Sequence, residues 1–150
     1  MYTGLLHLHS FLRWVILILL LVNIFRNYAN ANKPFTPTDR KLSLFLMISA
    51  HLTLLIGLYQ LFFGRYSWSQ VPAGTNVMKD NFWRFFLIEH PFGMIAAIVL
   101  ITIGNSTAKK NIADKKKHAK MGLLFLLALI IILATIPWPF REAVGRSLMP

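Results

Sequence analysis

Three histidines, His9, His51 and His90, each lie inside a different long apolar stretch of this chain. A neutral imidazole carries one hydrogen-bond donor and one acceptor, and hydrocarbon satisfies neither. Charged side chains at the centre of a membrane helix cost about 2.5–3.5 kcal/mol on insertion scales, and ionisable residues there usually serve a function. Histidine nitrogens at this depth are therefore candidate ligands for a metal ion or a haem iron.

Two charged residues accompany the histidines. Arg13 is the only basic residue well inside an apolar stretch, and Glu89 is the only acidic one. In a structural interpretation these side chains pair with each other, or Arg13 extends outward past Trp14. In a functional interpretation Arg13 neutralises a buried anion such as a haem propionate, while Glu89 moves a proton or orients a histidine. A buried ion pair alone stabilises a protein poorly, so both interpretations require a further benefit from the charges.

Small residues and a proline lie beside two of the histidines. Gly57 follows His51 by six residues, and Gly93 shares a helix face with His90. Small residues admit a flat porphyrin, but ordinary packing of membrane helices favours them as well. Pro91 has no amide hydrogen, which predicts a kink next to His90; a proline that is merely tolerated in a membrane helix is the alternative.

Histidines on separate helices suit a bis-histidine haem b, in which imidazoles from two facing helices hold the iron. The rise of a helix places His9 about 8 Å, His90 about 12 Å and His51 about 18 Å below the outer membrane surface. We expect His51 and His90 as the iron ligands, because this pair lies deeper and has more small neighbours. His9 with His90 is the alternative, and its two depths agree better. In a third interpretation all three are hydrogen-bonded packing residues.

The two remaining histidines are weaker candidates. His7 and His9 are two residues apart, so on a helix they point about 200° apart and cannot chelate one ion together. His118 lies among lysines at the start of the fourth apolar stretch, where we expect an exposed loop histidine.

The composition is that of a membrane protein. Of the 150 residues, 56% are hydrophobic, and the mean hydropathy is +0.57. A membrane-spanning helix needs about 20 predominantly apolar residues. Four stretches meet this requirement, at residues 5–25, 42–63, 82–103 and 121–138. The sequence therefore predicts an all-α membrane protein, with a single domain over residues 1–150 in which four transmembrane helices run up and down as a bundle.

The distribution of lysine and arginine predicts the orientation. The first and third connections between spans hold ten of these residues: Arg26, Lys33, Arg40, Lys41, Lys109, Lys110, Lys115, Lys116, Lys117 and Lys120. The other side holds five: Arg65, Lys79, Arg84, Arg141 and Arg146. By the positive-inside rule the first group faces the cytoplasm, so both termini are expected on the extracytoplasmic side. The net charge of +11 then reflects topology and does not indicate a nucleic-acid partner.

Aromatic residues typical of membrane interfaces mark the outer boundary. They are Phe62, Phe63, Tyr66, Trp68, Phe82, Trp83, Trp138 and Phe140. The chain has no cysteine, which excludes disulfides, iron–sulfur ligation and thioether-linked haem but not histidine-ligated haem b. The first apolar stretch is too long for a cleavable signal peptide and has no basic leader.

Four motifs carry a resemblance to a known family. They lie at residues 2–10 with 13–14, at 47–52, at 89–91 and at 134–140. With them the whole chain resembles a small four-helix bacterial membrane family usually labelled cytochrome b, distantly similar to the copper-resistance D and cytochrome b561 groups. The resemblance implies haem and the bacterial inner membrane. The regular histidine pairs of a two-haem b561-type carrier are missing here, so it implies at most one haem, in the outer half.

Together these features predict a haem b-binding membrane protein of the electron-transfer class. A quinone or an extracytoplasmic protein would exchange electrons with it, Arg13 would contact a propionate, and Glu89 would support the site or move a proton. One alternative is a non-catalytic accessory subunit of a membrane complex or a homo-oligomer. Another is a transporter of protons or metal ions that uses Glu89 and the histidines. An electron carrier or a subunit is favoured over a stand-alone enzyme.

Overall fold

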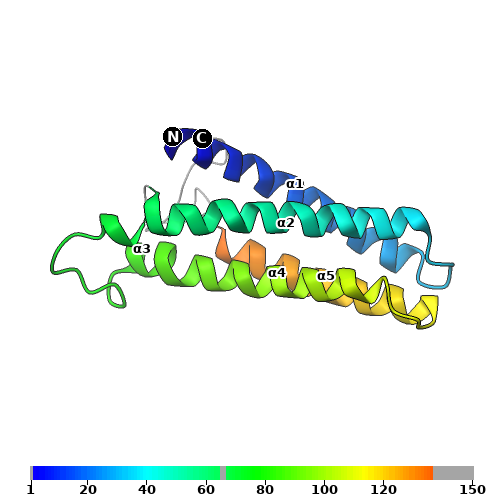
Figure 1. Ribbon diagram of the computed structural model, residues 1–150. Helices are drawn as coiled ribbons and strands as arrows, with labels where there is room; N and C mark the ends of the chain where they lie inside the picture. The colour runs from blue at the N-terminus through cyan, green and yellow to red at the C-terminus, as the bar shows by residue number, and fades with distance from the viewer. Residues whose placement is uncertain (1, 65–66, 137–150) are drawn as a thin grey trace.

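The computed structural model describes residues 2–64 and 67–136, and it is all-α over these residues. The long helices are α1 (Tyr2–Ala29), α2 (Pro37–Phe63), α4 (His90–Thr107) and α5 (Asp114–Thr135). Between α2 and α4 lie a 3-10 turn η1 (Trp68–Gln70), the short helix α3 (Asn81–Arg84) and a π-helical turn η2 (Phe85–Glu89) (Figure 1). Four helices, the third one including α3 and η2, are long and apolar enough to cross a membrane, as predicted.

The helices extend beyond the predicted spans at the end with the basic loops. Helix α2 begins at Pro37 because Thr36 and Asp39 form a capping box: the Asp39 N–H donates to Thr36 Oγ1 (3.3 Å), and the Thr36 N–H donates to the Asp39 carboxylate (3.0 Å). The same carboxylate is buried and accepts from Arg26 Nε at 2.9 Å, which ties α2 to α1. Helix α5 likewise begins at Asp114, seven residues before the predicted span.

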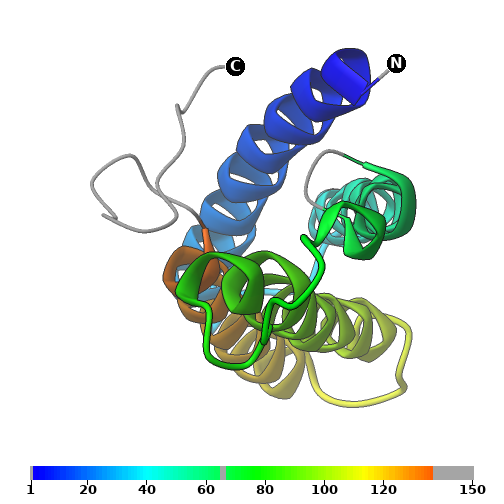
Figure 2. The same ribbon diagram turned by 90° about the vertical axis from the view of Figure 1, so that its left-hand side faces the viewer.

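The four long helices form an up-and-down bundle. Consecutive helices α1–α2 and α4–α5 pack together, and contacts of α1 with α5 and of α2 with α4 close the bundle. Leu20, Leu46, Ile101 and Phe125, one from each helix, are fully buried in its core. Figures 1 and 2 show α1 crossing the bundle obliquely and diverging from the other helices toward its N-terminal end. The bundle is therefore closed at one end and open beside the first turns of α1.

Helices α4 and α5 approach each other especially closely. A Cβ atom added at Gly104 would lie 2.6 Å from Cε1 of Phe125, a separation that real side chains do not show. A Cβ added at Gly93 would likewise collide with the side chain of Thr135. Glycine at both positions lets the two backbones pack tightly, as small residues do between membrane helices. The α4–α5 pair thus forms a rigid wall, in contrast to the diverging α1.

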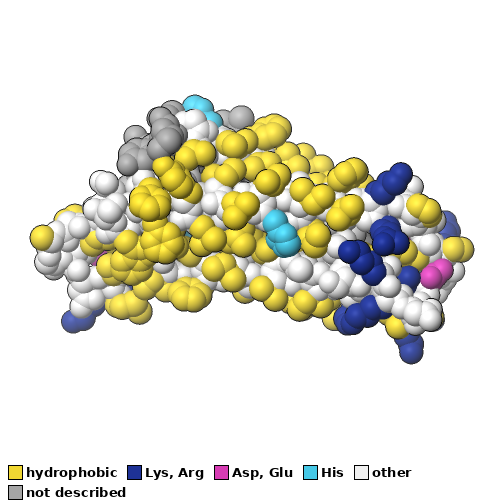
Figure 3. All heavy atoms as spheres, viewed as in Figure 1, with side chains coloured by type: hydrophobic (Ala, Val, Ile, Leu, Met, Phe, Trp, Pro, Cys, Tyr) yellow, Lys and Arg dark blue, Asp and Glu magenta, His cyan; other side chains and the backbone are white. Residues whose placement is uncertain are grey.

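The outward-facing surface is apolar along the helices and basic at one end. Large exposed side chains include Phe25 (73%), Leu55 (65%) and Phe92 (68%), a distribution that favours a lipid environment over water. The up-and-down path brings the ten lysines and arginines of the first and third connections to the same end, where Figure 3 shows basic side chains gathered. These features identify a multi-pass membrane protein.

Some predicted boundary residues lie outside the described residues. They are Arg65, Tyr66, Trp138, Phe140, Arg141 and Arg146. At the end away from the basic loops, Phe62, Phe63 and Trp68 are exposed, in agreement with their predicted place at an interface.

Candidate functional site

A cavity of about 160 Å³ lies where α1 diverges from the rest of the bundle. All four long helices contribute to its walls, which are mostly apolar. Six polar side chains interrupt this lining: His9, Ser10, Arg13, Thr53, Gln60 and His90. A largely apolar pocket with a few convergent polar groups is the usual form of a small-molecule or cofactor site.

Two of the predicted site residues meet in this cavity. The imidazole of His9, on α1, and that of His90, at the start of α4, have ring centroids 6.3 Å apart and planes inclined by 51°. The His9 ring lies against α2 where Gly57 has no side chain: a Cβ atom added there would be 3.6 Å from His9 Nε2. Gly57 therefore lets the ring lie close to the α2 backbone.

A π-helical turn sets the position of His90. The His90 N–H donates to the carbonyl of Phe85, five residues earlier, and Pro91, which has no N–H, follows directly. The π-helical turn accommodates Pro91, at which the sequence predicted a kink. Turns of this kind recur at functional sites. It also places the buried ring of Phe85 5.9 Å from the His90 ring, centroid to centroid.

The hydrogen bond of His90 defines which nitrogen carries the proton. His90 Nδ1 lies 2.7 Å from the backbone oxygen of Thr135. A carbonyl oxygen only accepts, so Nδ1 is protonated and, in the neutral ring, the lone pair is on Nε2. Thr135 is the last residue of α5, where carbonyls have no partner within the helix. The bond therefore gives the Thr135 carbonyl a hydrogen-bond partner and fixes the orientation of the His90 ring. Backbone carbonyls commonly orient metal-binding histidines in this way.

His51 occupies a different position. Its Nε2 lies 2.9 Å from Oγ1 of Thr102, in the seam between α2 and α4. The Thr102 hydroxyl donates its own hydrogen to the carbonyl of Ile98 at 2.7 Å, so it accepts from His51 and leaves Nε2 protonated. His51 is not among the residues that line the cavity. The structure thus brings together the alternative pair, His9 and His90, and not the preferred pair.

The two charged residues are separated as well. Arg13 lines the cavity one helical turn from His9, and its guanidinium lies 5.4 Å from the ring centroid of Trp14. Glu89 is about half exposed (47%), does not line the cavity, and lies 3.7 Å from Arg84 Nε. Of the alternatives left open by the sequence, the pairing of Arg13 with Glu89 is not observed; Glu89 instead pairs locally with Arg84.

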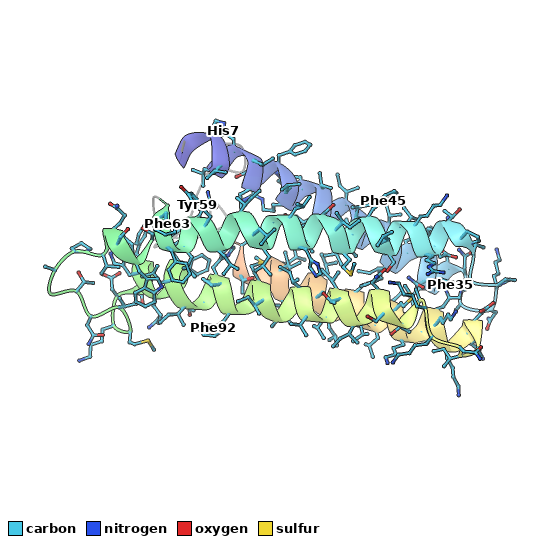
Figure 4. All side chains as sticks on the ribbon, in the orientation of Figure 1. His7, Phe35, Phe45, Tyr59, Phe63 and Phe92 are labelled. Atoms are coloured by element: carbon cyan, nitrogen blue, oxygen red, sulfur yellow. The ribbon has the colours of Figure 1, made fainter. Side chains whose placement is uncertain are left out.

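The two remaining histidines lie in different environments, His7 on the surface and His118 in the core. His7 is exposed near the N-terminal end of α1 (Figure 4), whereas His9 lines the cavity, so the two side chains lie on different faces of the helix as predicted. The expectation of an exposed loop position for His118 is wrong: the residue lies within α5 and is fully buried. Its Nδ1 lies 2.9 Å from Asn27 Oδ1 on α1, and Phe35 of the first connection packs on its ring. Because α5 begins at Asp114 and not at residue 121, His118 lies in a helical turn that packs against α1.

Buried polar residues near the basic end were not singled out from the sequence. Asn23 donates to the Leu42 carbonyl at 3.2 Å, and the Ser43 hydroxyl donates to Asn105 Oδ1 at 2.8 Å. These bonds join α1 to α2 and α2 to α4, as polar side chains do between membrane helices. An asparagine in an apolar stretch, such as Asn23, is the signal that could have found them.

No family model matches the chain, and no curated protein or solved structure matches it. The resemblance to the cytochrome b-labelled family therefore remains an expectation from the motifs, whereas the four-helix membrane fold rests on the structure.

Proposed function

We propose that the chain binds one haem b between His9 and His90 and carries electrons in the membrane. The observation that carries this proposal is the 6.3 Å between the centroids of the two rings. Two imidazoles on opposite sides of one metal ion, each bonded at about 2.0–2.1 Å, have centroids roughly 6 Å apart. The separation of the two rings supports His9 and His90 as the residues that would hold the iron.

The ligand set favours haem over a bare metal ion. Among the residues that the structure describes, no group of three or more His, Asp or Glu side chains could hold a metal ion. Two protein ligands suit an iron whose other four ligands come from a porphyrin. The apolar walls of the cavity also suit a macrocycle, since cofactor sites are mostly apolar.

A porphyrin needs more space than the cavity now offers. The cavity volume of about 160 Å³ is below the roughly 300–1,000 Å³ of typical ligand pockets. The α4–α5 wall is tightly packed, whereas α1 diverges from the bundle on the other side of the cavity. Outward movement of the first turns of α1 is thus the change that would admit the ring.

The remaining residues of the site have distinct roles in this proposal. Haem supplies one-electron redox chemistry, and the protein supplies ligands, orientation and a medium of low polarity. The Thr135 carbonyl orients His90, and Arg13 offers a positive charge to a propionate. By the positive-inside rule the cavity lies in the extracytoplasmic half, where a quinone or an extracytoplasmic protein would exchange electrons.

The core below the cavity disfavours the transporter alternative. The fully buried side chains of Leu20, Leu46 and Phe125, which lie outside the cavity lining, are all apolar. A relay for protons or metal ions would need polar groups or water at this level. Among the described residues, the polar side chains near the basic end bond mainly to one another and to the backbone.

The reduced-minus-oxidised absorption spectrum of the purified protein tests the proposal. We expect a sharp alpha band for the wild type, for His51→Ala and for Glu89→Gln. His9→Ala and His90→Ala should each lose the band while still eluting as folded protein. Wild-type protein that folds but stays colourless when haem is supplied contradicts the proposal. A stoichiometric partner copurifying with such colourless protein would favour the accessory subunit instead.

A further inference from the structure

Gly93 and Thr135 lie against each other in the seam between α4 and α5, and Gly93 follows His90 by three residues. A Cβ atom added at Gly93 would collide with Cγ2 of Thr135 and lie 3.2 Å from its Cβ. Gly93 is not among the residues that line the cavity. The missing side chain therefore leaves room for Thr135, as small residues do between packed membrane helices.

The side chain of Thr135 is held in place by its own helix. Its hydroxyl donates to the carbonyl of Ile131 at 2.8 Å, one turn earlier on α5. This bond selects among the χ1 rotamers that threonine adopts in helices, so rotation of the side chain away from α4 would cost the bond. A methyl group at position 93 would therefore displace Thr135 as a whole or push α4 and α5 apart.

Thr135 also supplies the oxygen that holds the His90 ring. His90 Nδ1 donates to the Thr135 carbonyl at 2.7 Å. His90 and Gly93 belong to the same helix, α4. A movement of Thr135 away from α4 at position 93 would therefore also lengthen this hydrogen bond, and at about 3.6 Å the contact would no longer be one. The orientation of His90 thus depends on the absence of a side chain three residues away.

We infer that Gly93 is a positioning residue: it lets Thr135 hold His90 with Nδ1 protonated, so that Nε2 is the nitrogen presented to a metal. Ligating histidines commonly donate from their other nitrogen to such an acceptor, and loss of the acceptor lowers metal affinity about 10–100-fold. The Thr135 carbonyl is at the C-terminal end of α5, where the helix dipole is negative, and this strengthens its attraction for the Nδ1 proton. The effect on a metal rests on the haem site proposed above, whereas the effect on the His90 ring does not.

The tautomer of His90 in the haem-free, full-length protein tests this role. Nitrogen-15 NMR of histidine-labelled protein distinguishes the two neutral tautomers, and the His90 signal is the one missing from His90→Gln. Gly93→Ala adds the colliding methyl group. The double variant Gly93→Ala/Thr135→Ser removes Cγ2, the atom nearest to that methyl group, and keeps the hydroxyl and the carbonyl. Gly104→Ala is the matched control, because it overpacks the same seam of α4 and α5 against Phe125. Haem is then titrated into each variant.

We expect His90 to be protonated at Nδ1 in the wild type, in Gly104→Ala and in the double variant, and to populate both tautomers in Gly93→Ala. The affinity for haem should fall about 10–100-fold in Gly93→Ala and recover in the double variant. An unchanged His90 tautomer in Gly93→Ala, or an equal change in Gly104→Ala, would overturn the inference.

The double variant also decides the case in which Gly93→Ala does not fold. A double variant that folds with His90 protonated at Nδ1 supports the inference, and one that folds without this tautomer overturns it. A wild type that shows the expected tautomer but binds no haem would contradict the proposed function and leave the positioning of His90 by Gly93 supported.

Discussion

The hydrogen bonds of the histidines separate candidate ligands from packing residues. His90 donates from Nδ1 to the Thr135 carbonyl, so its lone pair is on Nε2, and its ring centroid lies 6.3 Å from that of His9 in the cavity. His51 donates from Nε2 to Thr102 outside the cavity, and His118 bonds to Asn27 in the closed half of the bundle. The hydrogen-bond partners of these three histidines therefore distinguish one candidate ligand, His90, from two packing residues.

The space beside His9 gives a prediction for one residue. In Gly57→Ala the new methyl group would lie 3.6 Å from His9 Nε2, an ordinary contact, so haem binding should persist. In Gly57→Leu the additional carbons would occupy the space of the His9 ring and displace it. We expect the affinity for haem to fall at least about tenfold in the leucine variant, a loss of about 1.4 kcal/mol in binding. Unchanged affinity for haem in a folded leucine variant would contradict this placement of His9.

At the scale of helices, the sequence predicted the four spans because each is a long apolar run. Their ends were predicted less well, because the capping box at Thr36 and the early start of α5 extend the helices into polar sequence. The rotation of each helix about its own axis could not be predicted from similar apolar faces. That rotation places His9, and not His51, opposite His90, and it buries His118 against Asn27, 91 residues away.

Close packing of α4 on α5 gives a prediction at this scale. In Gly104→Ala the added Cβ would lie 2.6 Å from the ring of Phe125, which is itself fully buried. Overpacking of this kind costs about 1–3 kcal/mol, which outweighs the better helix propensity of alanine. We expect a lower midpoint of thermal unfolding in detergent.

Gly4→Ala is the matched control, because a Cβ added at Gly4 meets nothing within 4 Å. Its midpoint should stay the same or rise. If the two variants unfold at the same temperature, the close approach of α4 to α5 is wrong.

For the whole molecule, the diverging α1 and the concentrated basic charge distinguish the two ends of the bundle. One end is closed by Phe35, Asp39 and their partners, and it carries the basic connections. The other end holds the cavity. This polarity predicts that the bundle is oriented in the membrane, with the cavity toward one side and the basic connections toward the other.

The absence of cysteine makes that orientation simple to test. Asn76→Cys would place a thiol in the connection between α2 and α3, and Asn111→Cys would place one between α4 and α5. Both native side chains are exposed. By the positive-inside rule, a membrane-impermeant thiol reagent added to intact cells should label only the Asn76→Cys variant. Labelling of Asn111→Cys alone would reverse the orientation, and the cavity would then face the cytoplasm.

In the proposed site one iron is held by imidazoles from both His9 and His90. Electron paramagnetic resonance of the oxidised, haem-loaded protein tests it most directly, because the signal reports the axial ligands. We expect a low-spin ferric signal typical of two imidazoles in the wild type and in His51→Ala, and its loss in His9→Ala and in His90→Ala. A high-spin signal in the wild type, or a low-spin signal that survives His9→Ala but is lost in His51→Ala, would rule out His9 and His90 as the ligand pair.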